Sequence, residues 1–298
     1  MSDAKQGQSA YPINQSPEEM RRLTIQAEVL HNQPTRWLFE QAGLASSMRV
    51  LDIGCGAGDV SFLAAEFVGP NGAVVGLDSS LEALATARAR AAHHGLTNVT
   101  FVAGDLSRKI DFGPLAFGGH FDALVGRSVL MYLPDPAATL RSFLPLIRPG
   151  GVVAFREVLA GEPFLEAVPA CQLINEYNAW YKEHGLVALS AVGMAGQTGL
   201  RLHQVFQDAG LPPPHVWLHA PIGHTPDWFG WEYLTHQVQM IAALASKAGV
   251  PVPADLEPPT FGDRVRQQIL AQRGLLRIQR GVQASARLPV SVPDVLLS

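Results

Sequence analysis

Three glycines stand within five positions directly after a short apolar run, in the segment VLDIGCGAGDVS at residues 50–61. Because Gly54, Gly56 and Gly58 carry no Cβ atom, the chain can turn sharply there and a ligand can approach the backbone closely. The helix predicted to begin near Asp59 directs its first amides and the positive end of its dipole to the same place, which favours an anionic group. This spacing predicts a ligand cradle between a strand and a helix.

Two aspartates follow at the ends of the next two predicted strands. Asp78 ends VVGLD, roughly 20 residues further on, where a carboxylate can accept both hydroxyls of a ribose. Asp105 ends FVAGD, on the same predicted edge of the sheet. A turn and two helix caps would explain each signal separately, but ligands of open α/β sheets bind at this edge. The combination favours one nucleoside-shaped ligand.

The elements that must position these residues alternate regularly along the chain. Near-continuous apolar strands separated by helices are typical of a parallel sheet covered on both faces. We therefore predict an α/β fold with a doubly wound, mostly parallel sheet of seven strands. The predicted strands are RVLDIG, AVVGLD, VTFVAGD, FDALVG, VVAFREV, HVWLHAPI and GVQASARLP.

The pattern also predicts how the chain is divided. The segment SPEEMRRLTIQAEVL begins with a capping box, and PTRWLFEQAGL forms a second short helix that ends at Gly43. We expect four parts, which are an N-terminal arm and helix (1–35), a cofactor-binding core (36–159), a helical insertion (160–198) and a return to the core with the last strands (199–298).

Composition limits the classes of partner. The 298 residues are 47% hydrophobic with a formal charge of −4, which disfavours nucleic acid. The arginine-rich stretch 264–280 has Val265, Ile269 and Leu276 at helical spacing, which predicts a solvated helix face. Two cysteines exclude a disulfide framework, and neither a signal core nor a spanning apolar segment is found. We expect a cytoplasmic protein without a membrane partner; the sequence leaves open whether it forms a homo-oligomer.

The glycine spacing carries a family resemblance. VLDIGCGAGDVS resembles motif I of class I S-adenosylmethionine (SAM)-dependent methyltransferases of the bacterial small-molecule type. The acidic ends of the second and third strands, the turn IRPGG and the segment FDALVGRSVLMYLPDP are similar to the same family, over roughly residues 36–157. The G-x-G-x-x-G spacing common in NAD-binding proteins does not fit. Where many members have Asn or His after strand four, this chain has Arg127.

The resemblance implies SAM as the cofactor and assigns its contacts. The glycine loop, with Asp52, Gly54, Cys55 and Gly56, would hold the methionine portion. Asp78 and the adjoining Ser79 would lie at the ribose, Asp105 and the Leu106 amide would face the adenine, and Arg127 would lie beside the cofactor. In similar enzymes a leading tyrosine and helix close the pocket, which points to Tyr11, Arg22 and Gln26; a tail and a packing helix are the alternative.

Methyl transfer from a sulfonium is a direct displacement that needs alignment and exclusion of water. A general base helps only where the acceptor must lose a proton. Glu157, after strand five, and His224, among Trp217, Trp228 and Trp231, are the candidate bases. A capping or Arg156-paired carboxylate and a structural loop histidine are the alternatives, and the tryptophans form either a substrate wall or a core. The histidine spacing matches no metal motif, so no metal is expected.

These observations favour a methyltransferase that acts on a small organic acceptor, such as a natural product or an aromatic metabolite, at O, N or C. A nicotinamide-dependent oxidoreductase is an alternative, although a Tyr-x-x-x-Lys pair is missing from a suitable place. A nucleic-acid methyltransferase lacks its Asn-Pro-Pro-aromatic motif. The remaining alternative is a non-catalytic protein that binds SAM as a sensor or partner.

Overall fold

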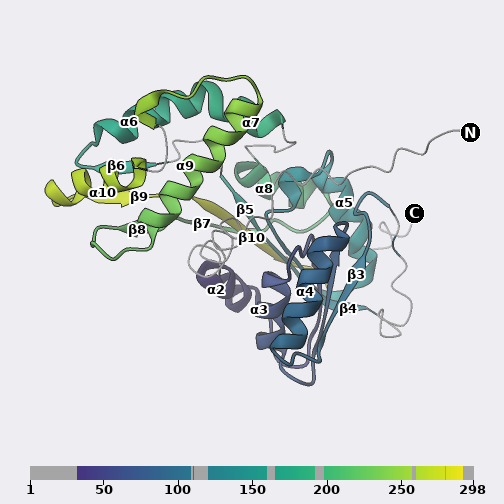
Figure 1. The fold of residues 1–298 in the computed structure, drawn as a ribbon. Helices are drawn as coiled ribbons and strands as arrows, with labels where there is room; N and C mark the ends of the chain where they lie inside the picture. The colour runs from purple at the N-terminus through teal and green to yellow at the C-terminus, as the bar shows by residue number, and fades with distance from the viewer. Residues whose placement is uncertain are drawn as a thin grey trace, which may run out of the picture.

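The structure is a computed structural model that describes residues 32–108, 110, 120–159, 165–191, 198–256, 260–278 and 280–290. These residues form two lobes (Figure 1). One lobe is built on a large twisted sheet with helices around it, and the other is a smaller, mainly helical lobe that joins one end of that sheet. The helix expected at 16–30 lies outside the described residues.

Seven strands form the large sheet in the spatial order β3–β2–β1–β4–β5–β10–β7. Strand β10 is antiparallel to both of its neighbours, and the pairs among β1 to β5 are parallel. The predicted seven-stranded, mostly parallel α/β sheet is therefore confirmed. The strands are β1 (Arg49–Ile53), β2 (Ala73–Asp78), β3 (Val99–Ala103), β4 (Phe121–Arg127), β5 (Ile147–Val158), β7 (His215–His219) and β10 (Gly281–Arg287).

The chain order of the strands reverses between β1 and β4, because β2 and β3 lie on one side of β1 and β4 lies on the other. Such a switch point is where open α/β sheets bind ligands, at the carboxyl ends of the strands. The glycine loop follows β1, and the turn at Ser128 follows β4. The topology therefore brings these two loops to the same place.

Helices cover both faces of this sheet (Figure 1). Strands β1, β2 and β4 are almost entirely buried, which explains their continuous apolar sequences. As predicted, Gly43 caps the end of the second short helix, with a left-handed φ of 79° directly after Ala42. The surrounding helices are α2 (Gln33–Ala42), α3 (Asp59–Val68), α4 (Leu81–His93), α5 (Pro136–Phe143) and α8 (Thr198–Asp208), with the short 3₁₀ turns η3 (Leu130–Tyr132) and η4 (Leu144–Leu146).

The second lobe has its own hydrophobic core, in which Tyr177, Tyr233 and Phe261 are fully buried. A small antiparallel sheet in the order β6–β9–β8 lies beside its helices. The elements of this lobe are β6 (Glu166–Val168), α6 (Gln172–Trp180), the π-helical turn η5 (Tyr181–Gly185), α7 (Leu186–Ala191), β8 (Ile222–Gly223), α9 (Gly230–Lys247), η6 (Ala254–Leu256), α10 (Phe261–Ala271) and β9 (Leu275–Arg277).

The second lobe lies at the carboxyl edge of the large sheet. The chain enters it from the carboxyl ends of β5 and β7, and it returns from β9 into the first residue of the antiparallel β10. These three connections therefore lie at the edge where the glycine loop emerges, and the fourth, between α7 and α8, runs through residues outside the described part of the chain. The C-terminal segment 199–298 is divided between the lobes, because α8, β7 and β10 belong to the large sheet while β8 to β9 belong to the second lobe.

The predicted helix over 264–280 is correct only in its first half. Val265 and Ile269 lie buried on α10, but the helix ends at Ala271 and Leu276 is buried on β9 instead. Arg273 takes a left-handed φ of 51°, and a Cβ atom at Gly274 would lie 2.9 Å from the Val168 carbonyl oxygen. The turn and the close approach of β6 therefore break the helical register.

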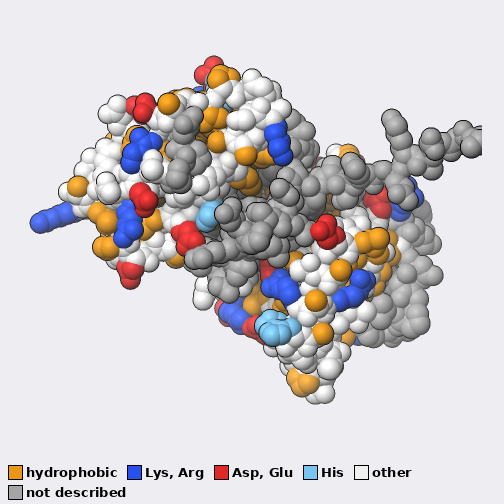
Figure 2. Space-filling model, viewed as in Figure 1, with side chains coloured by type: hydrophobic (Ala, Val, Ile, Leu, Met, Phe, Trp, Pro, Cys, Tyr) orange, Lys and Arg blue, Asp and Glu red, His pale blue; other side chains and the backbone are white. Residues whose placement is uncertain are grey.

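The surface of both lobes carries mixed charge. In Figure 2, Lys and Arg side chains are interspersed with Asp and Glu over the visible face. Across the part of the chain that is described, no helix is both long enough and apolar enough to cross a membrane.

Candidate functional site

The loop between β1 and α3 contains the three glycines, and all three have positive φ angles of 66°, 52° and 93° at Gly54, Gly56 and Gly58. A Cβ atom at Gly54 would lie 2.2 Å from Cγ2 of Val129, and one at Gly58 would lie 2.7 Å from Phe62. Among the described residues, no heavy atom lies within 4 Å of a Cβ atom placed at Gly56. Gly56 is thus the glycine of this loop that faces open space.

Three amides of this loop donate hydrogen bonds inside the protein. Cys55 N donates to the Leu77 carbonyl at 3.0 Å, Gly58 N to the Cys55 carbonyl at 2.9 Å, and Gly56 N to Oδ2 of Asp78 at 2.8 Å. The expected role of the first amides of α3 in binding an anionic group stays a prediction. The open surface is the Cα side of Gly56, which a bound molecule can approach without meeting a side chain.

Asp78 connects the ends of the first two strands. Its Oδ1 accepts from Ser80 N at 2.8 Å, while its Oδ2 accepts from Gly56 N. Each carboxylate oxygen has two lone pairs, so each can accept one further hydrogen bond. Asp78 therefore orients the glycine loop and keeps acceptor capacity suited to a pair of vicinal hydroxyls. The adjacent Ser79 is exposed.

Asp52 lies on β1, two residues before Gly54, and is fully buried. Its Oδ2 accepts from the Ser61 hydroxyl at 2.6 Å, and its Oδ1 has no hydrogen-bond partner. Burial is the main cause that raises the pKa of Asp52 to about 7, against the hydrogen bond from Ser61 and the charge of Arg127. An unpartnered buried acceptor beside the loop fits a site for a positively charged ligand.

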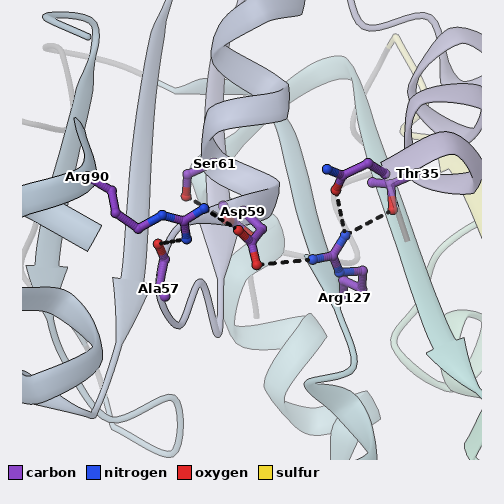
Figure 3. A network of polar contacts seen from close by, with 8 residues as sticks. Thr35, Ala57, Asp59, Ser61, Arg90 and Arg127 are labelled. Atoms are coloured by element: carbon purple, nitrogen blue, oxygen red, sulfur yellow. Dashed lines mark hydrogen bonds and ion pairs between the residues drawn. The ribbon is translucent and has the colours of Figure 1, made fainter. Parts of the chain in front are cut away.

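Charged side chains brace the loop from both sides (Figure 3). Asp59, the first residue of α3, lies 2.7 Å from Nη2 of Arg90 and 3.7 Å from Nη2 of Arg127. Arg90 also donates to the Ala57 carbonyl at 2.7 Å, and Arg127 lies 3.5 Å from the Thr35 hydroxyl on α2. The predicted site residue Arg127 therefore links β4, α2 and α3. Arg90 was not predictable from the sequence, because no local pattern relates it to Asp59, which lies 31 residues away.

The residues assigned to the adenine end lie at the carboxyl end of β3. The Asp105 side chain is 52% exposed, and its Oδ1 accepts from both Ser107 N at 2.9 Å and Ser107 Oγ at 2.7 Å. These hydrogen bonds, together with the Arg108 guanidinium, hold the pKa of Asp105 below its usual value. Leu106 is half-buried against the core of the sheet. Both residues are thus accessible at the predicted edge.

The two candidate bases have contrasting surroundings. Glu157 is fully buried, and its Oε1 accepts from Val129 N at 3.1 Å and Leu130 N at 2.9 Å, so its partners are backbone amides. Burial raises the pKa of Glu157 to about 7. His224 is exposed, between β8 and α9. The N-terminal candidates Tyr11, Arg22 and Gln26 lie outside the described residues.

The tryptophans in and after β7 are divided between two cores. Trp217 packs edge-on against Trp37 of α2, with ring centroids 5.0 Å apart, while Trp231 is buried in the core of the second lobe. Trp228 contacts Trp231 edge-on at 5.0 Å. Among the described residues, no group of three or more His, Cys, Asp or Glu side chains is placed to hold a metal ion.

Comparison with known proteins identifies the class. The family model described as "Methyltransferase domain" matches residues 44–210, which is more than half of the chain. The chain therefore belongs to this methyltransferase family, and its resemblance to class I SAM-dependent methyltransferases is confirmed.

Individual relatives agree with this class. An arsenite methyltransferase from Aquipseudomonas alcaligenes is 35% identical over 122 residues, which cover 39% of this chain and 34% of the relative. The ubiquinone biosynthesis O-methyltransferase of Pseudomonas aeruginosa is 33% identical over 180 residues, which cover 53% of this chain and 72% of the relative. The chain thus spans about a third of the first relative and nearly three quarters of the second.

A solved structure supports the fold. The YcgJ protein from Bacillus subtilis superposes with a TM-score of 0.55 and 14% sequence identity, over 87% of this chain and 99% of that one. At this identity the likeness shows the fold alone.

Proposed function

We propose that this protein is a SAM-dependent methyltransferase that transfers a methyl group to a small organic acceptor by direct displacement. The observation that carries the proposal is the open Cα surface of Gly56 next to Asp78, whose two carboxylate oxygens each keep a free lone pair. The names of the arsenite and quinone-pathway relatives support a small acceptor.

The chain's residues have separate tasks in this proposal. SAM supplies an electrophilic methyl group on a positively charged sulfur. The Gly56 surface and the buried Asp52 carboxylate receive the methionine end, Asp78 receives the ribose hydroxyls, and Asp105 with the Leu106 amide faces the base.

The second lobe supplies the acceptor side. Its connections to β5, β7 and β10 lie at the carboxyl edge of the large sheet, so it stands over the end of the sheet where the cofactor binds. Closing this edge excludes water and aligns the acceptor with the methyl carbon, which is what a displacement requires. The general-base role of Glu157 and His224, and the closing role of Tyr11, Arg22 and Gln26, stay predictions.

Isothermal titration calorimetry with S-adenosylhomocysteine (SAH), SAM and NADH tests the cofactor. We expect saturable binding of both adenosyl sulfur compounds and none of NADH; binding of NADH alone would favour the oxidoreductase alternative. Turnover is then measured by mass spectrometry with phenolic, catecholic and carboxylic acceptors and with arsenite. Tight SAM binding without methylation of any acceptor in such a panel would favour the sensor alternative.

A further inference from the structure

The turn after β4 is held by two consecutive residues of β5. Ser128 takes a left-handed φ of 52°, which costs a non-glycine residue roughly 1–2 kcal/mol. Its amide donates to the Arg156 carbonyl at 2.9 Å, and the next two amides, of Val129 and Leu130, donate to Oε1 of Glu157. The strained turn therefore depends on β5 for three of its hydrogen bonds.

The Glu157 side chain packs against this turn and does not reach the protein surface. Its side chain is fully buried, and a single oxygen receives both amides at 3.1 and 2.9 Å. Arg156, the neighbour on β5, points to the opposite face of the sheet because side chains alternate along a strand. The carboxylate thus accepts hydrogen bonds from the backbone of the turn, where a buried amide without an acceptor would destabilise the fold.

The same turn contacts the glycine loop and both hydrophobic cores. The Val129 side chain fills the space that a Cβ atom at Gly54 would need, with Cγ2 only 2.2 Å from that position. Val129 and Leu130 belong to the core under the large sheet, whereas Met131 is buried in the core of the second lobe. A shift of this turn would therefore reach the cofactor loop and the second lobe together.

We propose that Glu157 is a positioning residue, which fixes the turn 128–131 through backbone amides and thereby holds Val129 against Gly54 in the conformation that binds the cofactor. The expected effect on cofactor binding rests on the proposed function. In this role Glu157 does not contact the methyl acceptor. Holding the turn requires an oxygen that accepts hydrogen bonds from the two amides, and it does not require a base that takes up a proton.

Substitutions separate this role from a catalytic one. Glu157→Gln keeps an oxygen that accepts both amides, whereas Glu157→Ala removes it. By calorimetry with SAH we expect about tenfold weaker binding for Glu157→Ala and affinity within about threefold of wild type for Glu157→Gln. The matched control is Asp122→Ala, which removes a carboxylate that accepts the Arg49 amide at 2.7 Å at the opposite end of β4. It should lose stability but keep the wild-type affinity.

Val129→Ala should also weaken SAH binding. Because both substitutions act through one contact, the double variant Val129→Ala with Glu157→Ala should have the same affinity as the single variant that binds SAH less tightly. Unchanged affinity in Glu157→Ala, equal losses in the Gln and Ala variants, or additive losses would overturn the proposal. If Glu157→Ala does not fold, the Gln and Val129 variants still decide it.

Amide hydrogen exchange of the protein without ligand gives a readout that does not depend on the cofactor assignment. Glu157→Ala should accelerate exchange in both residues 128–132 and residues 54–58, Glu157→Gln should do so much less, and Asp122→Ala should leave both segments unchanged. Faster exchange confined to 128–132 would show that the turn does not hold the glycine loop and would refute the proposal, even if wild-type protein bound no SAH.

Discussion

Replacing Gly56 by alanine separates the backbone cost of the glycine loop from its role in binding. A Cβ atom at this position meets no atom of the described residues within 4 Å, so the substitution creates no clash with them in the free protein. Its φ of 52° is left-handed, which costs an alanine roughly 1–2 kcal/mol. Gly95 has the same combination, with a φ of 64° and open space, but it follows α4 away from the loop. Gly95→Ala is therefore the matched control.

The two variants should have similar stability and different affinity. In thermal denaturation we expect both to lose about 1–2 kcal/mol. A methyl group forced into a packed contact costs typically about 1–3 kcal/mol, so Gly56→Ala should bind SAH roughly tenfold to a hundredfold more weakly. Gly95→Ala should bind as wild type does in the same calorimetric titration. If both variants bind equally well, the open surface of Gly56 is not the cofactor surface.

Three further predictions concern the carboxylates and the N-terminal arm. Asp78→Ala removes an acceptor for two ribose hydroxyls and for Gly56 N. Because a charged hydrogen bond is worth roughly 1.5–3 kcal/mol, SAH affinity should fall about tenfold to a hundredfold. An unchanged SAH affinity in calorimetry would refute the assignment. Burial raises the pKa of Asp52 from 3.8 to about 7, so its contribution should lower stability as pH rises through that window, by at most about 4 kcal/mol, in addition to the contribution of Glu157. Asp52→Asn should flatten this dependence in denaturation curves, and identical slopes would contradict the burial argument. Deleting residues 1–15 should raise the KM for SAM if the arm closes the pocket, whereas unaltered kinetics would remove that role.

The large sheet was predictable because its signals are local. Strands β1, β2 and β4 are buried on both faces, and this produces continuous apolar runs that any window of the sequence reveals. The small sheet was not predictable for the opposite reason. Strands β6, β9 and β8 have only three, three and two residues, too few to show a period, and β9 pairs with segments far away in the chain.

The candidate site divides in the same way. The glycine loop and Asp78 could be predicted because clustered glycines indicate a left-handed backbone, and an aspartate directly after a strand indicates the edge of the sheet. The ion pairs of Asp59 with Arg90 and Arg127 join three separate elements, so they follow from the topology and not from spacing. Ser128 is left-handed without being glycine, and its sequence therefore gives no signal.

The three glycines of the loop have different structural roles, although their spacing makes them look like one motif. Gly54 makes room for Val129 from the turn after β4, and Gly58 makes room for Phe62 within α3. These two positions serve the packing of the protein against itself at the switch point. Gly56 alone of the three faces open space, so the case for a ligand there depends on this one residue and on Asp78 beside it. The other two glycines hold the loop in the shape that keeps this surface open.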